Sequence, residues 1–384
     1  MELVPSRQCQ HADWFATQGT SIEFCKSCGL ALLNSADPGV ENIYAKSQVQ
    51  PRPGDTFQPV QPSLLGIKAY RYLPLDLENG RYIRVLVLKA GWPDEPLCCA
   101  LEHVNLQQDP VYEALSYTWA DESGDDSLCR SIQCGDDGLI AITKNCEAAL
   151  RSLRKRDIHR RLWVDAVCIN QSDVLERSHQ VKNMIAIFRA ALRVVVFIGE
   201  GNVKTNRLVE YISRDSGGEL PKLWDIVSLF QCRWFHRIWV LQEVAVAKDI
   251  VVIYGPMQMT WADMVEHGNL FLKLMAARRH LAPPPPMLSY GLLQKSMPGH
   301  RTTRLDLLSL LQISRNCSCK DPRDKVYAIT GLLRDERTLP LQADYSPSTT
   351  AAWVFLQVAA WQITTSKSLE ILLHAEGISA MGAL

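Results

Sequence analysis

Four residues near the amino terminus have the types and spacing of a zinc site. They are Cys9, His11, Cys25 and Cys28, in the order C-x-H, thirteen residues, C-x-x-C-G. Structural zinc takes four Cys or His ligands, and the gap of a C-x-x-C pair lets one tight turn present two thiolates. Gly29 suits that turn because glycine accepts a positive φ. The pattern predicts a structural zinc ion. The alternative is four unrelated residues in an unfolded tail, because C-x-H is the less usual spacing.

A second group of residues stands in or after the predicted strands of the central sequence. Trp119 ends one apolar run, Asn170 and Gln171 follow the next, and Asp165 lies inside it. Ligands of open parallel sheets bind outside the carboxyl ends of the strands, so these side chains are predicted to line one crevice. Each has a structural interpretation too. Asp165 can bond a neighbouring loop, Trp119 can be core, and residues 170–173 can be a helix-capping turn.

Other catalytic motifs are missing from the sequence. His179 and His236 have no Cys or Ser at a spacing that suggests a catalytic dyad. No GxxxxGK[ST] loop is present, nor a GxGxxG after a strand. The sequence therefore predicts neither a hydrolase triad, nor nucleotide hydrolysis, nor dinucleotide redox chemistry.

Strand and helix patterns alternate from Tyr70 onward, and these elements must position the second group. The predicted strands are Arg81–Leu88, Tyr112–Trp119, Leu162–Ile169, 194–199 and 250–255. The predicted helices are Thr143–Arg156 with Thr143 as the cap, Glu176–Ala190, Leu223–Phe230 and Trp234–Ala247. Apolar strands separated by helices indicate a doubly wound α/β fold with a mostly parallel sheet covered on both faces.

The helix predicted at Glu176–Ala190 carries both an apolar stripe and a polar start. The stripe that we expect to face the core consists of Val181, Met184, Ile185 and Phe188. Glu176 opens the helix, where a carboxylate interacts favourably with the helix dipole. Glu176, Arg177 and Gln180 can alternatively form the contact surface of a neighbouring subunit.

We divide the chain into four parts: a zinc-ribbon-like element at 1–35, a linker at 36–68, an α/β domain at 69–256, and a mainly helical extension at 257–384. In the extension, Asp321-Pro322 and Ser346-Pro347 are predicted helix starts. The run SLEILLHA is strand-like. The chain stops soon after it, which suggests an incomplete partner layer or a truncated chain.

Composition restricts the class of protein. The chain has 384 residues, of which 47% are hydrophobic, and 41 basic residues balance 41 acidic ones. That balance gives no reason to expect nucleic acid or anionic lipid as a partner. No signal peptide or membrane-spanning run is recognisable, and the cysteines are spread through apolar segments. We therefore expect a cytoplasmic protein with mostly reduced, buried thiols.

Four blocks resemble the heterokaryon incompatibility (HET) domain and its usual downstream extension. They are YEALSYTWA from Tyr112, LWVDAVCINQSDVLERSHQVKNMIAIFRAALRVVVFIG from Leu162, RWFHRIWVLQEVAVAKD from Arg233, and DPRDKVYAITGLL from Asp321. Because the blocks are long and occur in the family's order, a chance match is very improbable. The family usually has Gly where this sequence has Ala120, and alanine restricts a turn that needs positive φ.

The resemblance implies a role in fungal non-self recognition and regulated cell death. HET domains are thought to be distant relatives of Toll/interleukin-receptor (TIR) domains, which implies a TIR/flavodoxin-like fold. Some TIR domains cleave nicotinamide from NAD⁺ with one glutamate on a helix, and similarity to that helix falls on Glu243. Trp239 lies four residues earlier, on the same predicted helical face. Glu243 can instead form a salt bridge with Arg237 or Lys248.

Two functional hypotheses follow from these residues. In the first, the chain is a non-catalytic signalling module that acts by self-association or by binding a protein partner. In the second, it is an NAD⁺-cleaving enzyme, with Glu243 as the catalytic carboxylate and with Trp119, Asp165, Asn170, Gln171 and Trp239 as substrate-binding residues. An enzyme needs Glu243 at an open crevice beside Trp119 or Asp165, whereas a signalling module tolerates a buried Glu243.

Overall fold

The computed structural model describes residues 14–16, 22–25, 31–33, 68–78, 81–135, 138–201, 229–266, 268, 306–333, 339 and 341–374. The chain divides into two compact units, one of Met1–Pro59 with Leu373–Leu384 and one of Val60–Leu372. The predicted α/β domain and most of the predicted helical extension therefore belong to a single unit.

The smaller unit contains a three-stranded antiparallel sheet. Its strands are β1 (Trp14–Ala16), β2 (Ile22–Cys25) and β3 (Ala31–Leu33), in that order. The predicted zinc ligands Cys9, His11 and Cys28 lie outside the described residues, and so does the side chain of Cys25, the last residue of β2. The zinc site stays a prediction.

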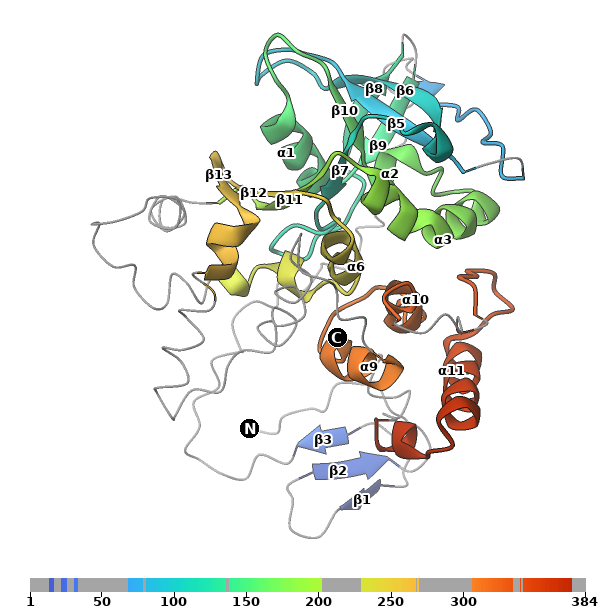
Figure 1. Cartoon of the computed structure of the whole chain (residues 1–384). Helices are drawn as coiled ribbons and strands as arrows, with labels where there is room; N and C mark the ends of the chain where they lie inside the picture. Colours follow the sequence, from blue (N-terminus) through green and yellow to red (C-terminus); the bar gives the residue numbers. More distant parts are fainter. Residues whose placement is uncertain are drawn as a thin grey trace, which may run out of the picture. The chain divides into compact units, whose positions relative to one another are not determined.

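The larger unit is built on one mixed sheet, with ten strands among the residues that the structure describes (Figure 1). In spatial order they are β13 (Met257–Thr260), β12 (Ile250–Tyr254), β11 (Arg193–Gly199), β7 (Glu113–Ser116), β10 (Arg160–Trp163), β5 (Tyr82–Leu88), β6 (Cys98–Asn105), β8 (Arg130–Cys134), β9 (Gly138–Ile142) and β4 (Lys68–Ala69).

The neighbours β12, β11, β7 and β10 are mutually parallel. Antiparallel pairings flank this block, with β13 on β12 at one side and β5 on β10 at the other. The α/β class is thus confirmed, and the sheet is mixed, with five parallel and four antiparallel pairings among its ten described strands. Local sequence shows that a strand is buried, but the direction of its neighbour depends on distant segments.

Helices cover the strands on both sides. They are α1 (Lys144–Leu153), the single turn α2 (Asp165–Cys168), α3 (Val174–Ala190) and α6 (Val240–Ala245). Figure 1 shows α1 on one side of the strands and α2 and α3 on the other. The start of α1 is as predicted, because the Thr143 hydroxyl accepts from the Cys146 N–H.

One predicted strand, Leu162–Ile169, is wrong in its second half. The strand β10 ends at Trp163, and Asp165–Cys168 forms one helical turn. The carbonyl of Val164 accepts from the N–H groups of Val167 and Cys168, which closes that turn. A short apolar run fits a buried strand and a buried helical turn equally well, so periodicity alone could not separate them.

The continuous helix predicted at Trp234–Ala247 is also wrong. A 3₁₀ turn, η3 (Arg233–His236), precedes α6, and the chain between them is extended at Arg237. There Arg237 forms an isolated parallel bridge with Ser318, and the Ile238 N–H donates to the Ser318 carbonyl at 3.1 Å. A segment about eighty residues away in the sequence breaks the helix, which no local pattern reports.

The buried face of α3 differs from the predicted stripe. Met184 and Phe188 are buried as expected, but Val181 and Ile185 are only partly buried. Glu176 and Gln180 are buried in their place, which contradicts their prediction as a contact surface for a neighbouring subunit. The Gln180 amide donates to the Tyr82 carbonyl at 2.9 Å, and this bond makes its burial possible.

The carboxyl-terminal part contains α9 (Leu307–Ser314), α10 (Asp324–Thr330), α11 (Ala351–Ser366) and the 3₁₀ turn η4 (Glu370–His374). The turn η4 replaces the predicted strand. Asp321 and Ser346 precede the helices α10 and α11 but do not cap them: the first is preceded by Arg323 without a side-chain cap, and Thr350 caps the second.

Two further predictions concern a helix before residue 231 and the boundary at residue 256. The helix predicted at Leu223–Phe230 lies outside the described residues except for Leu229 and Phe230. The strand β13 falls inside the predicted helical extension and adds to the sheet beyond residue 256. Among the helices that are described, none combines the length and the apolar character needed to cross a membrane.

Candidate functional site

Glu243 lies on α6 in the interior of the larger unit. Glu243 is 2% exposed. The hydroxyl of Ser116, at the carboxyl end of β7, donates to Glu243 Oε2. Arg237 Nη1 lies 3.6 Å from Glu243 Oε1. A buried carboxylate requires such partners, because an unpaired charge inside a protein is strongly destabilising.

Arg237 connects Glu243 to the ends of two neighbouring strands. Its guanidinium donates to the Tyr117 carbonyl just after β7, and Nη2 lies 3.9 Å from Asp165 Oδ2 just after β10. The extended backbone at Arg237 makes this reach possible. The break in the predicted helix therefore positions the cation of the site.

Trp119 and Asp165 lie in contact at the carboxyl ends of β7 and β10, and the crevice that the sequence predicts there stays a prediction. The indole N–H of Trp119 donates to Asp165 Oδ2 at 2.9 Å, and the Gln171 amide donates to the Asp165 backbone carbonyl at 2.8 Å. Because β7 and β10 are parallel neighbours, the residues that follow them share one edge of the sheet. We call Ser116, Trp119, Asp165, Arg237 and Glu243 the Glu243 network.

Asn170 belongs to a different buried cluster. Its backbone N–H donates to Glu176 Oε1 at 2.7 Å. Both carboxylate oxygens of Glu176 also accept from Arg84 on β5, at 2.5 and 2.9 Å. Asn170 Oδ1 accepts from the Ser172 hydroxyl at 2.7 Å, and Asp173 caps α3, so residues 170–173 do form a capping turn. The interaction of Glu176 is thus mainly with Arg84 rather than with the helix dipole.

Trp239 points to the carboxyl-terminal part of the unit and not to the Glu243 network. Its indole N–H donates to Asp324 Oδ2 at 3.1 Å, and the Tyr345 hydroxyl donates to Asp324 Oδ1 at 2.6 Å. The predicted spacing holds, since the Glu243 N–H donates to the Trp239 carbonyl. The two side chains nevertheless have separate partners.

Burial governs the acidity of these groups. It raises the pKa of Glu243, an effect that Arg237 and the Ser116 hydroxyl oppose. It raises the pKa of Asp324 to about 6, against the hydrogen bonds from Tyr345 and Trp239. The pKa of the Tyr117 hydroxyl is also raised by its burial. The site thus holds one carboxylate that is closed off and one that titrates near neutral pH.

Comparison with known proteins identifies the central segment. Residues 112–243 match the family described as heterokaryon incompatibility protein (HET). This chain contains a HET domain. Its match begins at Tyr112 and ends at Glu243, so the Glu243 network joins the first and last segments of the HET domain.

Two fungal relatives support this assignment. Heterokaryon incompatibility protein 6, OR allele, of Neurospora crassa is 25% identical over 367 residues, which covers 76% of this chain and 54% of that protein. Vegetative incompatibility protein HET-E-1 of Podospora anserina is 30% identical over 138 residues, which covers 35% of this chain and 9% of that protein. The chain spans about half of the first relative and about a tenth of the second. No solved structure matches, so the similarity of the HET domain to TIR domains stays a prediction.

Sequence reasoning missed Arg84, Ser116 and Asp324 as members of these clusters. Arg84 had a visible signal, because a charged residue inside the apolar run RYIRVLVL must have a buried partner. Asp324 and Ser116 carry no sequence signal of a buried partner. The alternative partner Lys248 does not reach Glu243, since its ammonium donates to the Ala190 carbonyl at 3.1 Å.

The Glu243 network contains an acid, a cation and an indole, but these groups already pair with one another. Glu243 is closed to solvent, whereas Asp165 and Arg237 keep side chains that are 18% and 20% exposed. Within the described ranges, no group of three or more His, Cys, Asp or Glu side chains could hold a metal ion. As it stands, the network is suited to fixing the carboxyl ends of β7 and β10.

Proposed function

We propose that this chain is a signalling module of heterokaryon incompatibility that acts in the cytoplasm, in fungal non-self recognition and programmed cell death, by self-association or by binding a protein partner. The observation that carries this proposal is the burial of Glu243 at 2% exposure, with Ser116 and Arg237 as partners. A catalytic carboxylate must reach its substrate, so a buried and paired glutamate favours a structural role.

An exposed apolar pair offers a contact surface for such a module. Val111 lies two residues before β7 and Leu192 one residue before β11, and they are 66% and 53% exposed. The Leu192 N–H donates to the Tyr112 carbonyl at 2.8 Å, which brings their backbones together. Exposed apolar side chains on two neighbouring segments favour protein contact.

The test measures self-association and NAD⁺ consumption in the same samples. Purified full-length chain at high concentration, with and without a crowding agent, is examined by analytical ultracentrifugation and by chromatographic assay of NAD⁺. We expect intact NAD⁺ and an oligomer that Val111→Asp weakens at least about tenfold, because the interface would bury a charge. The matched control is Leu128→Asp, at a leucine that is 57% exposed and lies outside the pair.

A monomer that leaves NAD⁺ intact restricts the proposal to binding of a different protein. Loss of NAD⁺ in the wild type but not in Glu243→Gln contradicts it, provided that the variant keeps the wild-type melting temperature. Glu243→Gln is preferred to Glu243→Ala because an amide keeps an acceptor for the Ser116 hydroxyl.

One observation favours cleavage of NAD⁺ as the second candidate function. Trp119 and Asp165 lie in the same network as Glu243, as an NAD⁺-binding crevice requires. In that case the Arg237 side chain must move to open Glu243, whose raised pKa suits a carboxyl that exchanges a proton. The NAD⁺ assay decides between the two candidates.

A further inference from the structure

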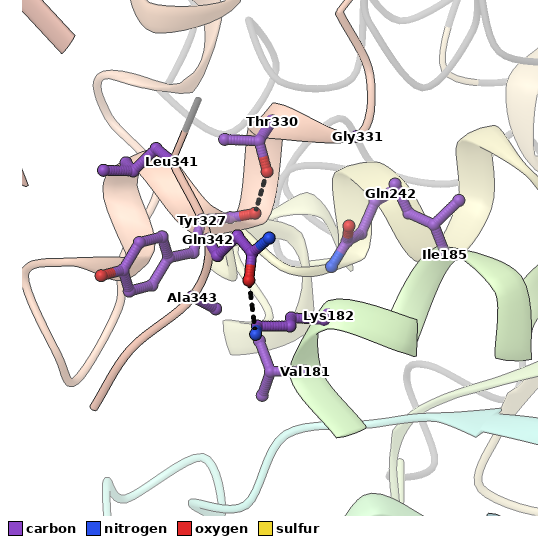
Figure 2. Close-up of a pocket in the computed structure, with 10 residues that line it drawn as sticks. All are labelled: Val181, Lys182, Ile185, Gln242, Tyr327, Thr330, Gly331, Leu341, Gln342 and Ala343. Carbon is purple, nitrogen blue, oxygen red and sulfur yellow. Dashed lines mark hydrogen bonds between the residues drawn. The ribbon is translucent and has the colours of Figure 1, made fainter. Parts of the chain in front are cut away.

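A cavity of about 250 Å³ lies where the carboxyl-terminal part packs on the helices of the HET domain (Figure 2). The helices α3 and α6 form one wall, and the end of α10 with residues 341–343 forms the other. Its lining residues are Val181, Lys182, Ile185, Gln242, Tyr327, Thr330, Gly331, Leu341, Gln342 and Ala343. None of the predicted substrate-binding residues is among them.

The side chain of Gln242 points into this cavity (Figure 2). The residue is only 3% exposed, yet its amide nitrogen Nε2 has no hydrogen-bond partner among the described residues. Buried donors nearly always have a partner, and leaving one unpaired is destabilising. The orphan N–H therefore points to a ligand with a hydrogen-bond acceptor.

The charge of the lining residues indicates which acceptor group the ligand carries. Lys182 is the one charged residue among those that line the described cavity, and no carboxylate is among them. Its ammonium donates to Gln342 Oε1 at 2.7 Å, which uses one of its three donors. A carboxylate satisfies both the amide of Gln242 and the free donors of Lys182.

The remaining walls are largely apolar and closely packed. Val181, Ile185, Leu341 and Ala343 present hydrocarbon surface. Gly331 ends α10 against Ile185, where a Cβ on Gly331 would meet Ile185 Cδ1 at 1.6 Å. The close approach of α10 to α3 depends on this glycine and sets the position of that wall.

We propose that this cavity binds a small carboxylic acid with an apolar body, whose carboxylate accepts from Gln242 Nε2 and faces Lys182. The volume lies below the roughly 300–1,000 Å³ of drug-sized sites, which limits the ligand to about ten non-hydrogen atoms. The ligand contacts the HET domain through α3 and α6, and it contacts the carboxyl-terminal part through the end of α10, Gly331 and Leu341–Ala343. Binding therefore stabilises the packing of one part on the other.

The test uses phenylacetate as the probe and phenylacetamide as its neutral match. Both are titrated into the full chain and followed by ligand-observed NMR. We expect phenylacetate to bind with a Kd of about 1 mM or lower, and the amide to bind at least about fivefold more weakly. Gln242→Leu and Lys182→Met should each weaken phenylacetate binding at least about fivefold. Arg189→Gln removes a charge from an exposed position of the same helix and should change nothing.

Ala343→Leu keeps every polar group of the cavity and fills its volume, so it should abolish binding. This variant tests the proposal independently of any effect that Gln242→Leu has on folding. We expect Gln242→Leu to fold with an unchanged or higher melting temperature, because it removes an unpaired buried donor. Absence of binding to the wild type at about 10 mM, ten times the expected Kd, overturns the proposal. Binding that Ala343→Leu leaves intact overturns it as well, since the probe then sits elsewhere.

Discussion

At the scale of single residues, buried charges organise this unit more than any catalytic arrangement does. Arg84 is 1% exposed and Glu176 is 3% exposed, and they form two parallel hydrogen bonds between β5 and α3. Arg84 also donates to the carbonyls of Leu73 and Cys168. One arginine therefore ties four segments of the chain together.

Removing one member of this pair should be strongly destabilising. Arg84→Met leaves the Glu176 carboxylate buried without its cation, and we expect the free energy of unfolding to fall by about 3–5 kcal/mol. The double variant Arg84→Met with Glu176→Gln removes both charges and should lose less. Chemical denaturation measures both.

The matched control for Arg84 is Arg161→Met, whose ion pair with Glu102 is 40% and 45% exposed. Exposed pairs contribute about 0–1 kcal/mol, so this variant should stay close to the wild type. Equal losses for Arg84→Met and Arg161→Met would contradict the organising role of the buried pair.

Asp324 gives the unit a stability that depends on pH. Its folded-state pKa of about 6 lies above the ordinary 3.8, so its contribution is fully present below pH 4 and is lost as the pH rises to about 6. A pKa shift of about two units corresponds to about 3 kcal/mol in the free energy of unfolding, an upper value for one group. We expect Asp324→Asn to be more stable than the wild type at pH 7 and to lose this advantage at pH 4. Denaturation at both pH values measures it, and an advantage that does not change with pH contradicts the assignment.

At the scale of elements, a side-chain cap marks the start of α1, α3, α9 and α11. The helix α3 begins at Val174, two residues before the predicted Glu176, because Asp173 accepts from the N–H groups of Leu175 and Glu176 at 2.9 and 3.0 Å. The same first turn presents Glu176 to Arg84. A cap and a buried ion pair therefore act on one turn of helix.

Loss of the α3 cap should have a moderate effect. We expect Asp173→Ala to lower the free energy of unfolding by about 1 kcal/mol, and Asp173→Ser to restore most of it because serine also accepts at this position. Denaturation curves compare them with Asp157→Ala, an exposed aspartate in a loop, which should change stability by less than about 0.5 kcal/mol. An effect of Asp157→Ala as large as that of Asp173→Ala would argue against a capping role.

At the scale of the whole molecule, the smaller unit carries a separate prediction, the zinc site. In the smaller unit, β2 and β3 are antiparallel, and Cys25 ends β2. The sequence places Cys28 in the connection to β3. A C-x-x-C pair that starts at the end of one strand has the spacing of the zinc site that the sequence predicts.

Metal analysis of the purified full chain tests this site. We expect stoichiometric zinc that Cys25→Ser reduces at least about tenfold, because a lost thiolate leaves three ligands. Cys319→Ser replaces a described cysteine of the larger unit and should keep the zinc. Zinc that survives Cys25→Ser, or a wild-type chain without zinc, contradicts the prediction.

The sequence by itself determined the α/β class, the strands β5, β11 and β12, the cap of α1, and the placement of Trp119 and Asp165 at one edge of the sheet. Periodicity and capping depend on neighbours within a few residues, and residues that follow parallel strands share an edge. Only the tertiary structure decided that Glu243 is buried, that Arg237 breaks a helix to reach it, and that β10 is followed by a turn of helix. The bond from Ser116 to Glu243 spans 127 positions and that from Arg84 to Glu176 spans 92. Contacts over such separations leave no periodic trace in the sequence, because they depend on how the elements pack and not on how each one forms.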